Sequence, residues 1–234
     1  MAGNLNQNIV SIFGLALILT LSGCSPIKQA RNVTESSFLG DYSQLKEGQD
    51  GEALKIYINP SYQQSCNTYN KVLIEPVSIW VRDNSDLADL DPEERSTLVN
   101  HLHGSLVNEL GKHYQIVNTP QPGTLRIRTA ITEAEGSWVV LDTVSSFVPQ
   151  LLVMSKLKEI ATGTATFVGR ASGEAEITDA VTGERFAAAV DSIVGAKSVT
   201  GVTSQWDDVT RAFDAWSGRL AYRLVNCGQR PPEE

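Results

Sequence analysis

Residues 124–133 read TLRIRTAITE, and this stretch gives the strand around which the fold can be placed. The apolar Leu125, Ile127 and Ile131 lie two or four residues apart, and Arg126 and Arg128 lie between them. This period of two is typical of a β-strand that buries one face and exposes the other. The stretch therefore predicts a half-buried strand.

A long helix is predicted upstream of this strand. Asp91 is a good N-cap, Pro92 suits the first helical position, and Glu94 completes a start that resembles a capping box. The leucines that follow are spaced four apart: Leu98, Leu102, Leu106 and Leu110. That spacing puts them on one face, which must pack on another element.

A hairpin and a second helix are predicted downstream. Residues 164–179 and 184–194 flank the loop DAVTGE, where Asp179 can bond the turn backbone and Gly183 can adopt positive φ. Near the C-terminus, apolar residues three or four apart form one stripe: Trp206, Val209, Phe213, Trp216, Leu220 and Leu224. This stripe is typical of an amphipathic helix.

Two stretches before the first helix have the composition of strands, residues 54–58 and 71–81. Pro76 cannot donate to a ladder, so the second strand should be an edge strand or bulged there. The order of elements predicts an α+β domain, with a small, mostly antiparallel sheet and two long amphipathic helices packed on one face.

The N-terminus resembles the export signal of bacterial lipoproteins. Residues 9–21 are apolar but shorter than the roughly 20 residues of a membrane-spanning helix. Leu21, Ser22 and Gly23 then precede Cys24, as in a lipobox that is cleaved before the cysteine. Residues 1–8 contain no Lys or Arg, which departs from the pattern of such signals. The alternatives are an uncleaved anchor and a buried apolar N-terminus.

The resemblance to lipoproteins implies acyl chains on the thiol and the amine of Cys24, which would anchor the protein in a membrane. Ser25, where an Asp would favour the inner membrane, implies the periplasmic side of the outer membrane. The predicted organisation is a signal peptide at 1–23, a lipidated tether at 24–36, a single α+β domain at 37–228 and a polar tail at 229–234. A surface-facing orientation stays open.

The charge of the chain disfavours one class of partner, and its cysteines predict a disulfide. The formal net charge is −8 and the pI is near 5.0, which disfavours nucleic acid as a partner. After lipidation of Cys24, only Cys66 and Cys227 remain, and two cysteines in an oxidising compartment predict a disulfide. Two unpaired buried thiols are the alternative.

No catalytic set, cofactor or metal site is predicted. His101, His103 and His113 all fall on or at the end of one predicted helix, so no Ser/His/Asp arrangement can be recovered. The sequence therefore favours a non-catalytic binding or envelope-assembly protein. An envelope hydrolase is one alternative. A carrier of small molecules or lipids is another, and it predicts an apolar cavity against Trp206 and Trp216.

The apolar segment 138–160 has two interpretations. It is a core-packing excursion between strands, or it is a surface that meets a protein partner or a second copy of the chain.

Two motifs resemble an uncharacterised bacterial lipoprotein family, domain of unknown function 3313. The first is SSFLGDYSQLKEG at 36–48, and the second is FVGRASGEAEITDAVTGERFAAAVD at 167–191. The resemblance implies a lipoprotein and brings no established activity. Within the first motif, one group of residues forms a possible docking site: Phe38, Asp41, Tyr42 and Ser43. The alternative is a segment pinned to the sheet.

Overall fold

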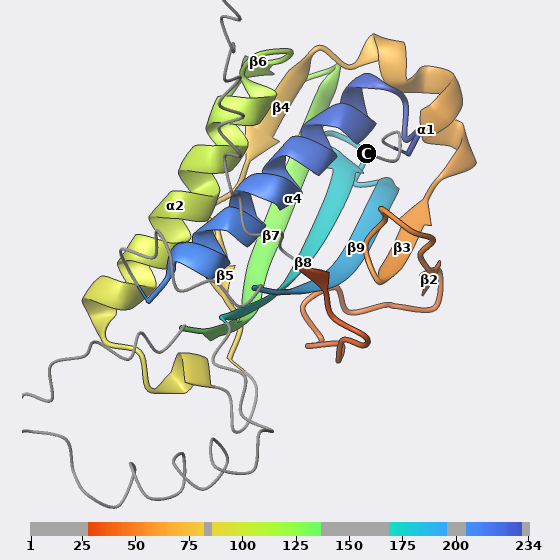
Figure 1. Cartoon of the computed structure of the whole chain (residues 1–234). Helices are drawn as coiled ribbons and strands as arrows, with labels where there is room; N and C mark the ends of the chain where they lie inside the picture. The colour runs from red at the N-terminus through yellow and green to blue at the C-terminus, as the bar shows by residue number, and fades with distance from the viewer. Residues whose placement is uncertain (1–27, 82–85, 137–168, 196–204, 231–234) are drawn as a thin grey trace, which may run out of the picture.

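A mixed β-sheet with two helices across one face makes up the domain (Figure 1). The computed structural model describes residues 28–81, 86–136, 169–195 and 205–230. Helices α2 (Pro92–Leu110) and α4 (Asp207–Val225) pack against each other and cover the same face of the sheet. Helix α1 (Pro60–Ser65) is short and continues into the 3-10 helix η1 (Cys66–Thr68). A second 3-10 helix, η2 (Asp86–Ala88), precedes α2.

The sheet has nine strands in the described part of the chain, in the order β2-β3-β9-β8-β7-β4-β6, with β1 on β9 and β5 on β7. Their bounds are β1 Lys28–Gln29, β2 Lys46–Glu47, β3 Lys55–Ile58, β4 Lys71–Ile74, β5 Ser78–Ile79, β6 Gln115–Ile116, β7 Thr124–Glu135, β8 Arg170–Asp179 and β9 Arg185–Val194. Strands β7, β8 and β9 pair antiparallel, whereas β4 and β5 both run parallel to β7.

The predicted fold class is wrong. The sheet is large and mixed rather than small and mostly antiparallel, and the described residues include a third, short helix, α1, besides the two long helices α2 and α4. Four strands contain only two residues each, too few for a period of two to be visible. The parallel pairs arise because α2 lies between β5 and β7 in the chain, and a helical crossover returns the chain in the same direction.

Several local predictions are confirmed. The Asp91 side chain accepts hydrogen bonds from the backbone N–H groups of Glu93 and Glu94, and a full capping box is present. In the hairpin, Asp179 Oδ1 accepts from the backbone of Val181 and Thr182. Gly183 has a φ of 74°, and Pro76 falls in the gap between β4 and β5.

The core has two parts, one on each face of the sheet. The helix face holds the larger part, where the leucines of α2 and Phe213 of α4 pack on Leu125, Ile127 and Ile131. The opposite face is covered by an N-terminal segment, whose Phe38 and Leu39 pack on a small cluster: Ala130, Ala188 and Val190.

The predicted signal peptide, its motif Leu21, Ser22 and Gly23, and Cys24 lie outside the described residues, as does the segment 138–160. Within the predicted tether, Lys28 and Gln29 pair with β9. No described helix is long and apolar enough to cross a membrane.

Candidate ligand-binding cavity

An apolar cavity of about 140 Å³ lies between α4 and the sheet. Its floor contains one row of residues that pair across four adjacent strands: Ile56, Ala189, Ala175 and Thr129. Paired residues in adjacent strands point to the same face. The row therefore leads from the outer strand β3 to the inner strand β7 beneath the helices.

Small side chains in the floor leave this space open. Ala175 and Ala189 are half-buried although they face the helix layer, because α4 does not fill the volume above them. Gly173 lies beside them, and a Cβ there would approach Cζ3 of the Trp216 ring to 3.1 Å. Glycine thus lets the indole lie directly against the strand.

Helices α4 and α2 supply the rest of the wall. Trp216, Leu220 and Leu224 line the cavity from α4, and Leu102 and Leu106 line it from α2. Trp216 and Leu220 belong to the predicted stripe, yet they are only half-buried, whereas Val209 and Phe213 in the same stripe are fully buried. The stripe therefore packs tightly in its first half and borders the cavity in its second half.

One polar group lies in the floor without a partner. Thr129 is 7% exposed, and its Oγ1 makes no hydrogen bond with any described residue. A buried hydroxyl without a partner costs roughly 1–3 kcal/mol.

Asp191 ties α4 to the sheet at the rim of the cavity. Its carboxylate is 7% exposed and accepts from Trp216 Nε1 at 2.8 Å and from Arg219 at 3.2 Å. It also accepts from Gln29 Nε2 at 2.8 Å and from the backbone N–H of Leu54 at 3.2 Å. This carboxylate thus joins α4, β1 and the start of β3.

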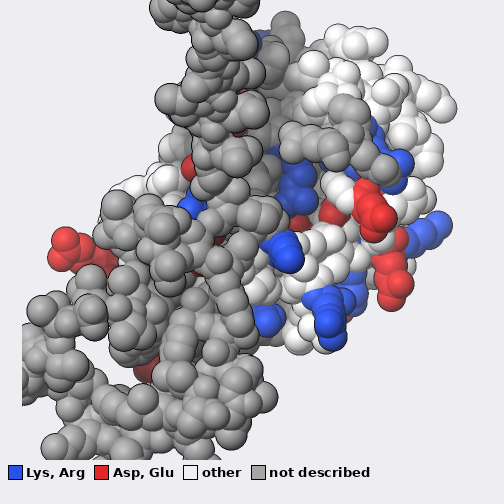
Figure 2. Space-filling view, viewed as in Figure 1, with Lys and Arg blue, Asp and Glu red and all other residues white. Residues whose placement is uncertain are grey.

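A second ion pair closes the rim. Arg223 donates to Glu52 Oε1 at 2.8 Å, and both side chains are mostly buried. Burial opposes ionisation of Glu52, but hydrogen bonds from the Gln49 backbone and from Arg223 outweigh it and lower its pKa. Figure 2 shows basic and acidic side chains intermixed on the described part of this face. The rim pairs two arginines with two carboxylates and so carries no net charge.

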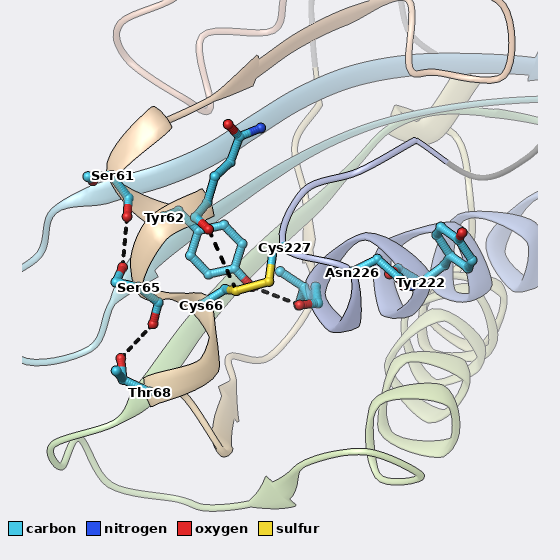
Figure 3. Close-up of a disulfide and its surroundings, with 10 residues drawn as sticks. Ser61, Tyr62, Ser65, Cys66, Thr68, Tyr222, Asn226 and Cys227 are labelled. Carbon is cyan, nitrogen blue, oxygen red and sulfur yellow. Dashed lines mark hydrogen bonds between the residues drawn. A yellow bond between two sulfur atoms is a disulfide. The ribbon is translucent and has the colours of Figure 1, made fainter.

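The predicted disulfide is confirmed, and it lies beside Tyr62 near one end of the cavity (Figure 3). Cys66 and Cys227 are bonded, with their Cα atoms 5.4 Å apart. Beside them, the Tyr62 hydroxyl donates to the carbonyl of Leu224 at 3.0 Å, and Tyr62 lines the cavity. Burial raises the Tyr62 pKa. The disulfide therefore ties the chain just after α4 to η1.

The possible docking motif lies on the opposite face. Phe38 is buried and meets the Trp80 ring edge to face, and the Tyr42 hydroxyl donates to Glu174 Oε2 at 2.6 Å. Burial, and then this hydrogen bond, raise the Tyr42 pKa. Asp41 and Ser43 are exposed, and Asp41 Oδ1 accepts from the Ser43 backbone at 2.8 Å. These two are the side chains that a partner could reach, and the docking role stays a prediction.

The histidines do not gather into a site. His101 Nε2 lies 3.1 Å from Asp214 Oδ1, and both side chains are well exposed. Such an exposed pair is surrounded by water and is weak. No three His, Cys, Asp or Glu side chains come together as a metal site within the described ranges.

Sequence reasoning identifies only part of the cavity. The carrier hypothesis places Trp206 and Trp216 against a cavity, and Trp216 lines it, but Trp206 does not. Sequence reasoning does not single out Asp191 or Thr129 as residues of the cavity. One signal in the sequence could have indicated the cavity. It is the small residues of the two paired strands of the hairpin, at Ala175, Ala187 and Ala189.

Together these features define a two-layer domain with an apolar cavity between its layers. The model of the family described as "Protein of unknown function (DUF3313)" matches residues 34–220, and the chain belongs to this family. No curated protein matches the chain.

Solved structures that are similar to this chain include the following two. The PelC dodecamer from Paraburkholderia phytofirmans has 11% identity and a TM-score of 0.33, over 69% of this chain and 90% of that one. Protein XCC0632 from Xanthomonas campestris, of family DUF330, has 12% identity and a TM-score of 0.41, over 72% of this chain and 90% of that one. Likeness of this kind does not transfer a function.

Proposed function

We propose that this protein is a non-catalytic binding protein of the bacterial envelope, anchored by lipid on Cys24 to the periplasmic side of the outer membrane. The cavity between α4 and the sheet is the observation that carries the binding role. The sequence LSGC at residues 21–24 supports the anchor.

The size of the cavity argues for a ligand. The space of about 140 Å³ is walled almost entirely by apolar side chains, and an apolar ligand would remove this surface from water. Protein interiors are normally close-packed, and a larger side chain in place of Ala175 or Ala189 would occupy part of this space. Apolar cavities of comparable size bind small apolar molecules such as benzene.

Filling the cavity is expected to abolish binding. In the full chain in lipid nanodiscs, benzene should shift the NMR signal of the Trp216 indole N–H, because this side chain lines the cavity. Ala189→Ile places a larger β-branched side chain in the floor and should remove that shift. Ala88→Ile, at an exposed position outside the cavity, is the matched control and should retain it. Equal shifts in all three proteins would contradict a ligand site in this cavity.

Anchoring is tested separately by cell fractionation. The wild-type protein should sediment with outer membranes, and its intact mass should show cleavage before Cys24 and added acyl chains. Cys24→Ser should remove both the cleavage and the acyl chains. An unmodified wild-type mass would contradict the anchor and leave the cavity proposal intact.

Contact with a protein partner, or with a second copy, through residues 138–160 is the second part of the proposal. Light scattering of the acylated protein in mild detergent should give a defined oligomer, and deletion of 138–160 should give a monomer. The apolar composition of this segment supports the expectation. If the full protein and the deletion variant had the same oligomeric state, the segment would have no role in assembly.

A further inference from the structure

We propose that the ligand of this cavity is an uncharged, linear aliphatic molecule with one hydrogen-bonding group, which pairs with Thr129 at the inner end. This inference rests on the proposed binding function and specifies its ligand class. Its three supports are the length of the floor, the neutrality of the rim and the hydroxyl without a partner.

The floor is long and narrow. The row Ile56, Ala189, Ala175 and Thr129 crosses three intervals between adjacent strands. Strands lie about 4.8 Å apart, so the row is about 14 Å long. An extended alkyl chain of about twelve carbons has that length, because its bonds of about 1.5 Å follow a zigzag path and advance about 1.25 Å each. The row therefore fits a linear molecule.

The rim does not favour a charged group inside. Asp191 binds Arg219, and Glu52 binds Arg223, so each charge that borders the opening already has a partner of opposite sign. The remaining walls are aliphatic or aromatic, with Ile58 and Ala187 beside the row and Leu220 above it. Moving an ionised group into such a space without a partner is costly. The part of the ligand that enters is therefore uncharged.

Thr129 provides the polar contact at the inner end. It lies on β7, the strand of the row farthest from the outer strand β3, close to the leucines of α2 that line the cavity. Its Oγ1 is buried and makes no hydrogen bond with the described part of the protein. The Oγ1 atom is enclosed, so rotation about the Thr129 Cα–Cβ bond must first turn it toward the cavity. A ligand hydroxyl or amide there would then satisfy it, and a hydrocarbon would not.

The test compares 1-hexanol with n-hexane, titrated into the full chain in nanodiscs at matched free concentrations, with the Trp216 indole signal as readout. Thr129→Val keeps the β-branched shape and removes the hydroxyl. It should weaken binding of 1-hexanol about 3–10-fold and leave hexane unchanged or tighter. Thr129→Ser keeps the hydroxyl and should retain most of the affinity for 1-hexanol.

The outcomes separate the two proposals. An equal change in affinity for both probes in Thr129→Val would overturn the pairing with Thr129 and leave the cavity as a plain apolar site. Tight binding of hexanoate at pH 8 would overturn an uncharged ligand. If neither 1-hexanol nor n-hexane shifts the Trp216 signal of the wild-type protein, the proposed binding function itself fails.

Discussion

Replacing Asp191 with alanine is expected to lower the free energy of unfolding by about 3–5 kcal/mol. The carboxylate accepts from Trp216 Nε1 and from Arg219, which both come from α4. Removing it leaves the guanidinium of Arg219, whose side chain is 29% exposed, without its partner beside a new void. An uncompensated buried charge is more costly than the net gain from forming the pair.

Urea denaturation followed by tryptophan fluorescence measures this loss. Asp214→Ala is the matched control, because Asp214 is also an aspartate of a pair but is 58% exposed. It should cost less than about 1 kcal/mol. Asp191→Asn should fall between the two, since the amide keeps the volume and one acceptor oxygen. Similar losses for Asp191→Ala and Asp214→Ala would contradict the role of Asp191 in holding α4 on the sheet.

Loss of the Cys66–Cys227 disulfide is expected to lower the free energy of unfolding by about 2–5 kcal/mol. The two cysteines are 161 residues apart, and in the chain-entropy model longer loops give larger effects. The double variant Cys66→Ala/Cys227→Ala should also loosen the end of α4. Tyr62 and Leu224 at that end line the cavity, so binding of benzene should weaken as well.

Chemical denaturation with and without dithiothreitol separates the bond from the substitutions. The reductant should destabilise the wild-type protein by about as much as the double substitution does, and it should have no effect on the double variant. If the reductant left the wild-type midpoint unchanged, the bond would contribute nothing to stability. If stability fell and benzene binding did not change, the disulfide would have no part in shaping the cavity.

Elements that depend on a few neighbouring residues could be predicted from the sequence. The capping box at Asp91 and the four leucines of α2 appear where the spacing places them. The turn that Asp179 and Gly183 form is equally local. The disulfide follows from counting cysteines, without any knowledge of how the two approach each other.

The size and direction of the sheet could not be predicted in the same way. The strands β1, β2, β5 and β6 are held by pairing with partners elsewhere in the chain, and two residues carry no readable pattern of their own. A helix between two strands, such as α2 between β5 and β7, indicates that parallel pairing occurs. It does not indicate which strands pair, and that depends on the assembled sheet.

The sequence by itself determined the two long helices, their apolar faces and the hairpin, and it predicted the anchor, because each depends on residues close together in the chain. The tertiary structure alone decided the candidate site. Ile56, Ala189, Ala175 and Thr129 come from four strands and meet only through the register of the sheet. Asp191 would be solvent-exposed on an isolated strand, and it is buried here because α4 brings Trp216 and Arg219 over it. A cavity is the space that distant elements leave between them, and no local pattern encodes that space.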